Sequence, residues 1–101
     1  MIEIYSLEGC YYSQTAEQLL TQYGIKHKVY PVSQKNKNIY KKKNKMNTFP
    51  QIFLKKRINN KMKTIKIGGC DDLKSLLEIY NHIKSSNIKL DTVCYFLKSI
   101  K

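Results

Sequence analysis

The spacing of apolar positions changes twice in the first third of the chain, and each change predicts a new element. Residues 2–6 form a short apolar run that is typical of a strand. From 11 to 23 the apolar residues recur every three or four positions, as on one face of a helix, and Gly24 follows where helices commonly end. The run 27–32 is again rich in strand-forming residues. This order predicts two parallel strands joined by a right-handed helical crossover.

The middle of the chain predicts a solvated helix and then a hairpin. Segment 33–47 holds six lysines among few apolar residues, which favours a short, mostly solvated helix with Ser33 as its N-cap. Residues 49–54 and 63–67 both resemble strands. The Asn-Asn pair at 59–60 tolerates the positive φ angles of a tight turn. We therefore expect these two strands to be antiparallel.

After Gly68-Gly69, two apolar stripes with helical spacing predict two more helices. The stripes are Leu73, Leu76, Leu77, Tyr80 and Ile83, followed by Leu90, Val93, Cys94, Leu97 and Ile100. The complete order is β-α-β-α-β-β-α-α. Two parallel strands followed by an antiparallel pair predict an α/β protein with a four-stranded mixed sheet flanked by helices, which is a thioredoxin-like fold.

Length and cysteine content narrow the class of protein. A chain of 101 residues predicts a single domain, 1–101. It has no apolar run near the roughly 20 residues that a membrane span needs, and its first residues lack the features of a signal peptide. Three widely spaced cysteines do not make a disulfide framework, and no Cys/His cluster suggests a zinc site. We expect a cytoplasmic protein with free thiols.

The formal net charge of +12 would attract nucleic acid, an anionic membrane or acidic substrates. However, Arg57 is the single arginine, whereas phosphate-binding surfaces favour arginine. Lysine, asparagine and isoleucine are all abundant, as in proteins from AT-rich genomes, including those of viruses and parasites. We attribute the charge to this bias and do not expect nucleic acid or a membrane to be the partner.

Cys10 lies where the first predicted strand gives way to the first helix. Unpaired backbone N–H groups and the positive end of the helix dipole favour a thiolate there, and the thiolate is the nucleophilic form. The alternative is a buried cysteine that acts as a small apolar residue. Position alone leaves both interpretations open.

Three stretches in register resemble the glutaredoxin family over residues 2–83. GCYYS at 9–13 is similar to that family's Cys-Pro-Tyr-Cys or Cys-x-Tyr-Ser active site. TFPQIF at 48–53 is similar to its Thr-Val-Pro-x-Ile/Val-Phe stretch, in which the proline is cis. IGGCDDL at 67–73 is similar to its Gly-Gly-x-x-Asp-Leu/Phe stretch.

The resemblance implies an enzyme that reduces protein–glutathione mixed disulfides, with glutathione as co-substrate and Cys10 as the catalytic residue. It also implies a set of glutathione-binding residues: Tyr12, Phe49, Pro50, Asp71 and Asp72. The expected partners are glutathione and glutathionylated proteins, and the expected state is a monomer.

Ser13 occupies the place of the family's second, resolving cysteine, so the resemblance implies a monothiol cycle. We expect the Ser13 hydroxyl to donate a hydrogen bond to the thiolate or to cap the first helical turn. Cys94 should be buried in the last helix, and Cys70 should adjoin the glutathione site but lie too far from Cys10 to replace the missing thiol.

Two positions depart from the family's pattern, and one alternative function remains open. Leu7 stands where glutaredoxins often have a lysine, and one of the lysines at 41–45 is a candidate to replace it. Asp71 stands where many relatives have Ser or Thr. The alternative function is a carrier in which two subunits hold a [2Fe–2S] cluster through Cys10 and bound glutathione. Tyr11 is bulkier than the glycine of dedicated carriers and favours the enzyme.

Overall fold

The computed structural model describes residues 1–83, 90, 92 and 93, and four of its segments form one sheet. The strands are β1 (Ile2–Leu7), β2 (His27–Val32), β3 (Gln51–Ile58) and β4 (Lys61–Gly68), in the order β2-β1-β3-β4. β1 runs parallel to β2 and antiparallel to β3, and β3 runs antiparallel to β4. The predicted four-stranded mixed sheet is therefore confirmed.

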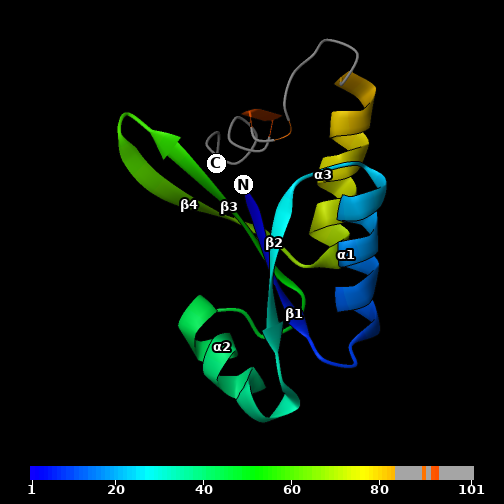
Figure 1. The fold of residues 1–101 in the computed structure, drawn as a ribbon, viewed down its shortest axis with the longest axis vertical. Coiled ribbons are helices and arrows are strands. Elements are labelled where there is room, and N and C mark those ends of the chain that lie inside the picture. The colour runs from blue at the N-terminus through cyan, green and yellow to red at the C-terminus, as the bar shows by residue number, and fades with distance from the viewer. Residues whose placement is uncertain (84–89, 91, 94–101) are drawn as a thin grey trace.

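Within residues 1–83, three α-helices accompany the sheet: α1 (Tyr11–Gln22), α2 (Lys37–Asn44) and α3 (Cys70–Ile83). Figure 1 shows α1 and α3 side by side on one side of the sheet and α2 apart from them, near the end of the sheet where β1 finishes. None of the described helices is long and apolar enough to cross a membrane.

The core lies between the sheet and the α1/α3 pair. Alternate side chains of β1 and β3 point into it, and the predicted apolar stripes of α1 and α3 cover them. The completely buried members are Ile2, Ile4, Ala16, Leu20, Ile52, Leu54 and Leu73. Leu90 and Val93, from the last predicted helix, join the same cluster; Cys94, Leu97 and Ile100 lie outside the described residues.

The opposite face of the sheet carries aromatic residues, and α2 rests on them. The Tyr5 ring stacks on Tyr30 at 4.8 Å between centroids and contacts Tyr40 of α2 at 5.5 Å. The Asn44 side-chain amide donates to Gln51 Oε1 at 2.8 Å. These polar and aromatic contacts, rather than an apolar stripe, hold α2 against the sheet.

The segment before β3 differs from its prediction. We expected one short, mostly solvated helix with Ser33 as its N-cap. Ser33 is the N-cap residue, although its side chain makes no capping bond, but a 3₁₀ turn (Gln34–Asn36) precedes the α-helix. Helix α2 then ends at Asn44, and its C-cap residue, Lys45, has a left-handed φ of 54°. No residue of α2 is buried. A helix without a buried face needs no apolar periodicity in its sequence, and that periodicity is what predicted α1 and α3.

The hairpin follows its prediction closely. Asn59 and Asn60 have φ angles of 52° and 64°, as a two-residue turn with both central residues left-handed requires. β3 and β4 continue up to this turn, so both strands are longer than their apolar runs suggested. The hairpin end extends past the part of β3 that pairs with β1.

Candidate functional site

Cys10 is the N-cap residue of α1 and has extended backbone angles, φ −90° and ψ 119°. Its N–H donates to the Leu7 carbonyl at 3.1 Å, which closes the turn between β1 and the helix. Its side chain makes no capping bond, and the first turn of α1 contains no acidic residue to compete for the helix N-terminus. The side chain is half-buried, so Cys10 is not the buried apolar residue that its position also allowed.

The second motif brings its backbone to this sulfur. The Phe49-Pro50 peptide bond is cis, as the resemblance implied, and both residues are buried. The Phe49 carbonyl oxygen lies 3.9 Å from Cys10 Sγ, within the range of a weak S–H···O hydrogen bond. Two segments that are 39 residues apart therefore meet at the thiol.

Ser13 is completely buried, and its Oγ accepts a hydrogen bond from the Leu7 N–H at 3.1 Å. Neither of our expectations for Ser13 included this bond. It joins the end of β1 to the first turn of α1, across the turn that carries Cys10. The serine at the resolving position therefore has a structural partner of its own.

We predict that Ser13→Ala lowers the free energy of unfolding by about 1–2 kcal/mol, because the Leu7 N–H loses its partner in a buried setting. Urea denaturation would measure the change. Ser75→Ala, at an exposed position of α3, is the matched control and should be nearly neutral. Equal destabilisation by both substitutions would contradict the role of the Ser13–Leu7 bond.

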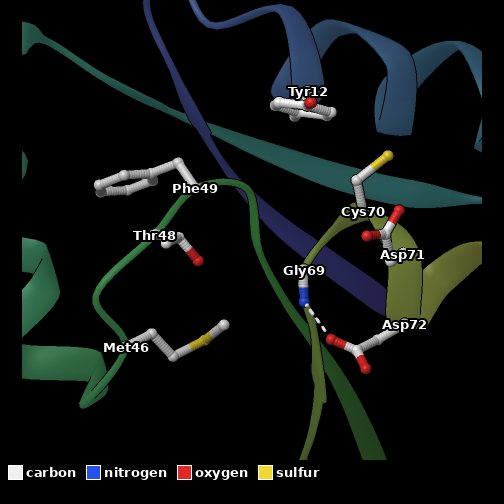
Figure 2. Close-up of a pocket in the computed structure, with 8 residues that line it drawn as sticks. All are labelled: Tyr12, Met46, Thr48, Phe49, Gly69, Cys70, Asp71 and Asp72. Atoms are coloured by element: carbon white, nitrogen blue, oxygen red, sulfur yellow. Dashed lines mark hydrogen bonds between the residues drawn. The ribbon is translucent and has the colours of Figure 1, made fainter.

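A pocket of about 310 Å³ lies between the start of α1, the segment before β3 and the start of α3. The residues that line it are Tyr12, Met46, Thr48, Phe49, Gly69, Cys70, Asp71 and Asp72 (Figure 2). Four of the five predicted glutathione-binding residues are among them, and the fifth, Pro50, is buried at the neighbouring position. The three motifs thus surround one pocket.

Met46 is a wall residue that sequence reasoning missed, because it lies in a lysine-rich segment with no recognisable pattern. None of the described residues that line the pocket is a lysine, so none of the lysines at 41–45 forms part of its wall. The charged groups of the wall are instead the carboxylates of Asp71 and Asp72.

The turn between β4 and α3 shapes one side of the pocket. Gly68 has a φ of +124°, which glycine adopts without strain, and α3 starts at Cys70. The Gly69 N–H donates to Asp72 Oδ2 at 2.9 Å (Figure 2), and the Leu73 N–H donates to the Gly69 carbonyl at 3.0 Å. Asp72 thus acts as the reach-back arm of a capping box, a role that its motif alone did not reveal.

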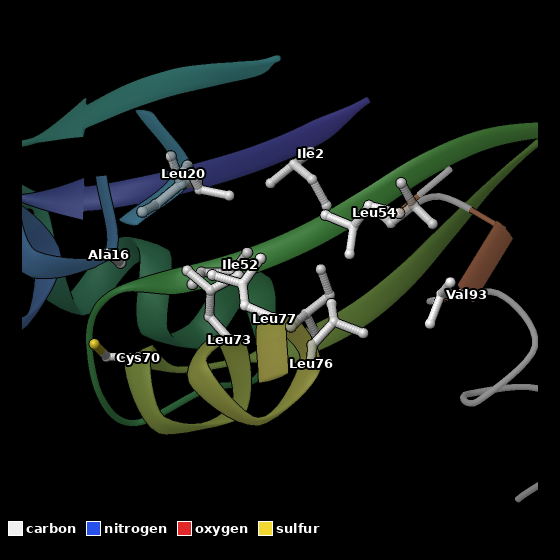
Figure 3. Close-up of a cluster of buried hydrophobic side chains, with 13 residues drawn as sticks. Ile2, Ala16, Leu20, Ile52, Leu54, Cys70, Leu73, Leu76, Leu77 and Val93 are labelled. Carbon is white, nitrogen blue, oxygen red and sulfur yellow. The ribbon is translucent and has the colours of Figure 1, made fainter. Parts of the chain in front are cut away.

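Cys70 contributes a thiol to the pocket, whereas Cys10 is not among the described residues that line it, and Figure 2 shows the Cys70 sulfur pointing toward α1. Its side chain also lies at one end of the core cluster (Figure 3). Burial raises the pKa of the Cys70 thiol; the Lys74 charge opposes this rise and the Asp71 charge adds to it. Cys70 therefore stays protonated where an ordinary cysteine begins to ionise, which makes it a poor nucleophile.

We predict that iodoacetamide modifies Cys70 at least about tenfold more slowly than Cys10 near neutral pH. Because the pKa of Cys70 is raised, its alkylation should accelerate only at a higher pH than that of an exposed cysteine. Peptide mapping by mass spectrometry over time would separate the two sites. Equal rates for Cys10 and Cys70 would contradict the difference in environment.

Comparisons with known proteins bear on the fold and on two of the motifs. The sequence model described as Glutaredoxin matches residues 2–58, which include Cys10 and Pro50. A comparison with curated protein sequences finds no match.

Solved structures of glutaredoxins share the fold. The solution structure of a Brucella melitensis glutaredoxin is 27% identical, with a TM-score of 0.59, and the match covers 99% of this chain and 90% of that one. Glutaredoxin 1 from Francisella tularensis, complexed with cacodylate, is 23% identical with a TM-score of 0.59, and the match covers 80% of this chain and 95% of that one. A wheat glutaredoxin is 22% identical with a TM-score of 0.53, and the match covers 93% of this chain and 77% of that one.

The fold and the match of more than half of the chain lead to one conclusion: this protein belongs to the glutaredoxin family, whose members are thiol–disulfide oxidoreductases with a thioredoxin-like fold.

Proposed function

We propose that the protein reduces protein–glutathione mixed disulfides by a monothiol mechanism, with Cys10 as the nucleophile and glutathione as co-substrate. The observation that carries the proposal is the position of Cys10. It is a half-exposed thiol at the N-terminus of α1, 3.9 Å from the Phe49 carbonyl that borders the pocket. Position 13, where a resolving thiol would stand, holds a buried serine.

The proposed cycle has two exchanges, each by thiolate attack on a disulfide. The Cys10 thiolate attacks the glutathione sulfur of the mixed disulfide, the old S–S bond breaks, and the substrate protein leaves as a thiolate that takes up a proton. Glutathione, as its thiolate, then attacks the glutathione sulfur bound to Cys10. Oxidised glutathione leaves, and Cys10 returns as a thiolate.

The walls of the pocket suit glutathione in both exchanges. The backbone N–H groups of Asp71 and Asp72 open α3, where a helix attracts a carboxylate such as that of the glutamyl group. Because the Asp72 side chain is already bonded to the Gly69 N–H, part of its charge is satisfied before an anion binds. Phe49 would offer its backbone to the peptide part of glutathione, and the Tyr12 ring would flank it.

The side chain of Tyr11 favours this enzyme over a cluster carrier. Tyr11 is 73% exposed and projects from the same turn as Cys10, with its ring 5.6 Å from that of Tyr12. Two chains that shared a [2Fe–2S] cluster through Cys10 would have to accommodate both Tyr11 rings at the contact. A small mixed disulfide meets no such requirement.

A glutathione-coupled assay on glutathionylated 2-mercaptoethanol tests the proposal. We expect turnover with parallel double-reciprocal lines when both substrates are varied, because Cys10 carries glutathione between the two exchanges. An absorbance spectrum of the fresh protein comes first. No turnover, together with a brown colour that Cys10→Ser removes, would overturn the proposal in favour of a cluster carrier.

A further inference from the structure

Helix α2 has two faces of different character. Tyr40 and Asn44 face the sheet, where they contact Tyr5 and Gln51. Ile39 and Lys42 lie on the other side, and Lys43 lies at the edge between the two faces, with its ammonium group over the Tyr40 ring. All three residues are exposed, and Ile39 is 62% exposed although its side chain is apolar. Their spacing of three and four residues places them together on the helix surface. We call these three residues the outer face of α2.

Among the described residues, no ion pair neutralises the lysines around this face. Segment 33–47 contains six lysines and no acidic residue. The ion pair that the structure describes, Lys55 with Glu3 at 3.6 Å, lies elsewhere on the sheet. Lys43 does lie over the Tyr40 ring at 5.7 Å, which holds its ammonium group without neutralising it. The outer face of α2 therefore combines one apolar side chain with two unpaired cations.

The face is also close to the site along the chain. Phe49 is five positions after Asn44, the last residue of α2, so the two residues lie at most about 18 Å apart. Met46 and Thr48, within that link, line the pocket. A protein whose disulfide reaches Cys10 would thus bring neighbouring segments near α2.

We propose that the outer face of α2 docks acidic protein substrates, seating an apolar side chain on Ile39 and carboxylates on Lys42 and Lys43. The inference rests on the proposed function and names the class of protein substrate that the enzyme prefers. Since Asp71 and Asp72 line the pocket, the acidic residues of such a substrate belong some distance from its cysteine rather than beside it.

An acidic polypeptide fits the face better than nucleic acid does. A polypeptide supplies an apolar side chain for Ile39, carboxylates for the lysines and a thiol for Cys10, whereas nucleic acid supplies only the charge. The outer face also has no aromatic ring on which a base could stack, because Tyr40 faces the sheet.

The test compares two double variants with the same change in net charge. K42E/K43E alters the outer face of α2, and K61E/K63E alters exposed lysines near the hairpin turn, roughly 20–27 Å along β4 from Gly69 in the pocket wall. The substrates are a glutathionylated acidic peptide, its neutral counterpart and glutathionylated 2-mercaptoethanol. Circular dichroism checks that both variants are folded.

We expect K42E/K43E to lower kcat/KM for the acidic peptide about tenfold and to leave the small disulfide unchanged. K61E/K63E should change kcat/KM for the acidic peptide and for the small disulfide by no more than about twofold. I39A should also lower kcat/KM for the acidic peptide. A purely electrostatic interaction would leave that value unchanged, because the substitution removes no charge. Added salt should narrow the difference between the acidic and neutral peptides in the wild type.

Three outcomes would overturn the docking proposal: equal losses in both double variants, no preference for the acidic peptide, or an oligonucleotide that displaces that peptide and binds more tightly. Failure of the proposed function appears separately, as a wild type that does not turn over the small disulfide. In that case, fluorescence anisotropy of the unmodified acidic peptide on C10S and on C10S/K42E/K43E still tests docking. Equal affinities would overturn it.

Discussion

Replacing Cys10 with serine should lower kcat/KM for glutathionylated 2-mercaptoethanol at least about a thousandfold, because the hydroxyl cannot replace the thiolate in disulfide exchange. The site holds no second nucleophile in the right state: position 13 is a serine, and burial raises the pKa of Cys70. The fold should not change, since Cys10 is half-exposed and its sulfur makes only a weak contact with the Phe49 carbonyl. The coupled assay with purified variants measures the effect.

Cys70→Ser is the matched control for this loss. It removes the thiol that lines the neighbouring pocket, and we expect it to keep activity within about threefold of the wild type. If Cys70→Ser were as inactive as Cys10→Ser, Cys70 would take part in the exchange and the monothiol scheme would be wrong.

Replacing Gly68 with alanine should lower the free energy of unfolding by about 2 kcal/mol and raise KM for glutathione. The φ of +124° is unfavourable for any residue with a Cβ, and a Cβ there would collide with the Asp72 carboxylate. Asp72 would then have to give up its bond to the Gly69 N–H, which loosens the start of α3 at the pocket wall. Urea denaturation and glutathione-dependent kinetics measure the two effects.

Gly69→Ala separates this strain from the general effect of adding a methyl group. A Cβ at Gly69 would meet the Pro50 carbonyl at 3.8 Å, an ordinary van der Waals distance, and its φ is not in the strained range. We therefore expect a change in unfolding free energy below about 1 kcal/mol. A Gly68→Ala variant as stable as Gly69→Ala would contradict the importance of the Gly68 conformation.

The meeting of the three motifs around one pocket could be expected from the sequence, because each motif is short and has a recognisable pattern. Cys10, Phe49-Pro50 and Gly68-Gly69 each have a local reason for their residue types, and all three motifs meet around one pocket. The hairpin was equally readable, since asparagine pairs are among the few that accept two successive left-handed angles.

What the sequence could not show depends on contacts between distant segments. The bond from the Leu7 N–H to Ser13 and the contact of Met46 with the pocket follow from packing, not from any local pattern. The 3₁₀ turn before α2 could not be predicted from the lysine-rich segment, for a related reason. Because no residue of α2 is buried, its sequence has no apolar pattern that would indicate its first residue. The side of the helix that faces the sheet is determined by the contact of Tyr40 with Tyr5.

Trapping the intermediate tests the central claim most directly. The protein would be mixed with a glutathionylated peptide in the absence of free glutathione, quenched with acid and digested for mass spectrometry. We predict glutathione on Cys10 and released, reduced peptide, because in the proposed mechanism Cys10 attacks the glutathione sulfur of the mixed disulfide. Substrate peptide attached to Cys10, or glutathione found first on another cysteine, would contradict the monothiol account.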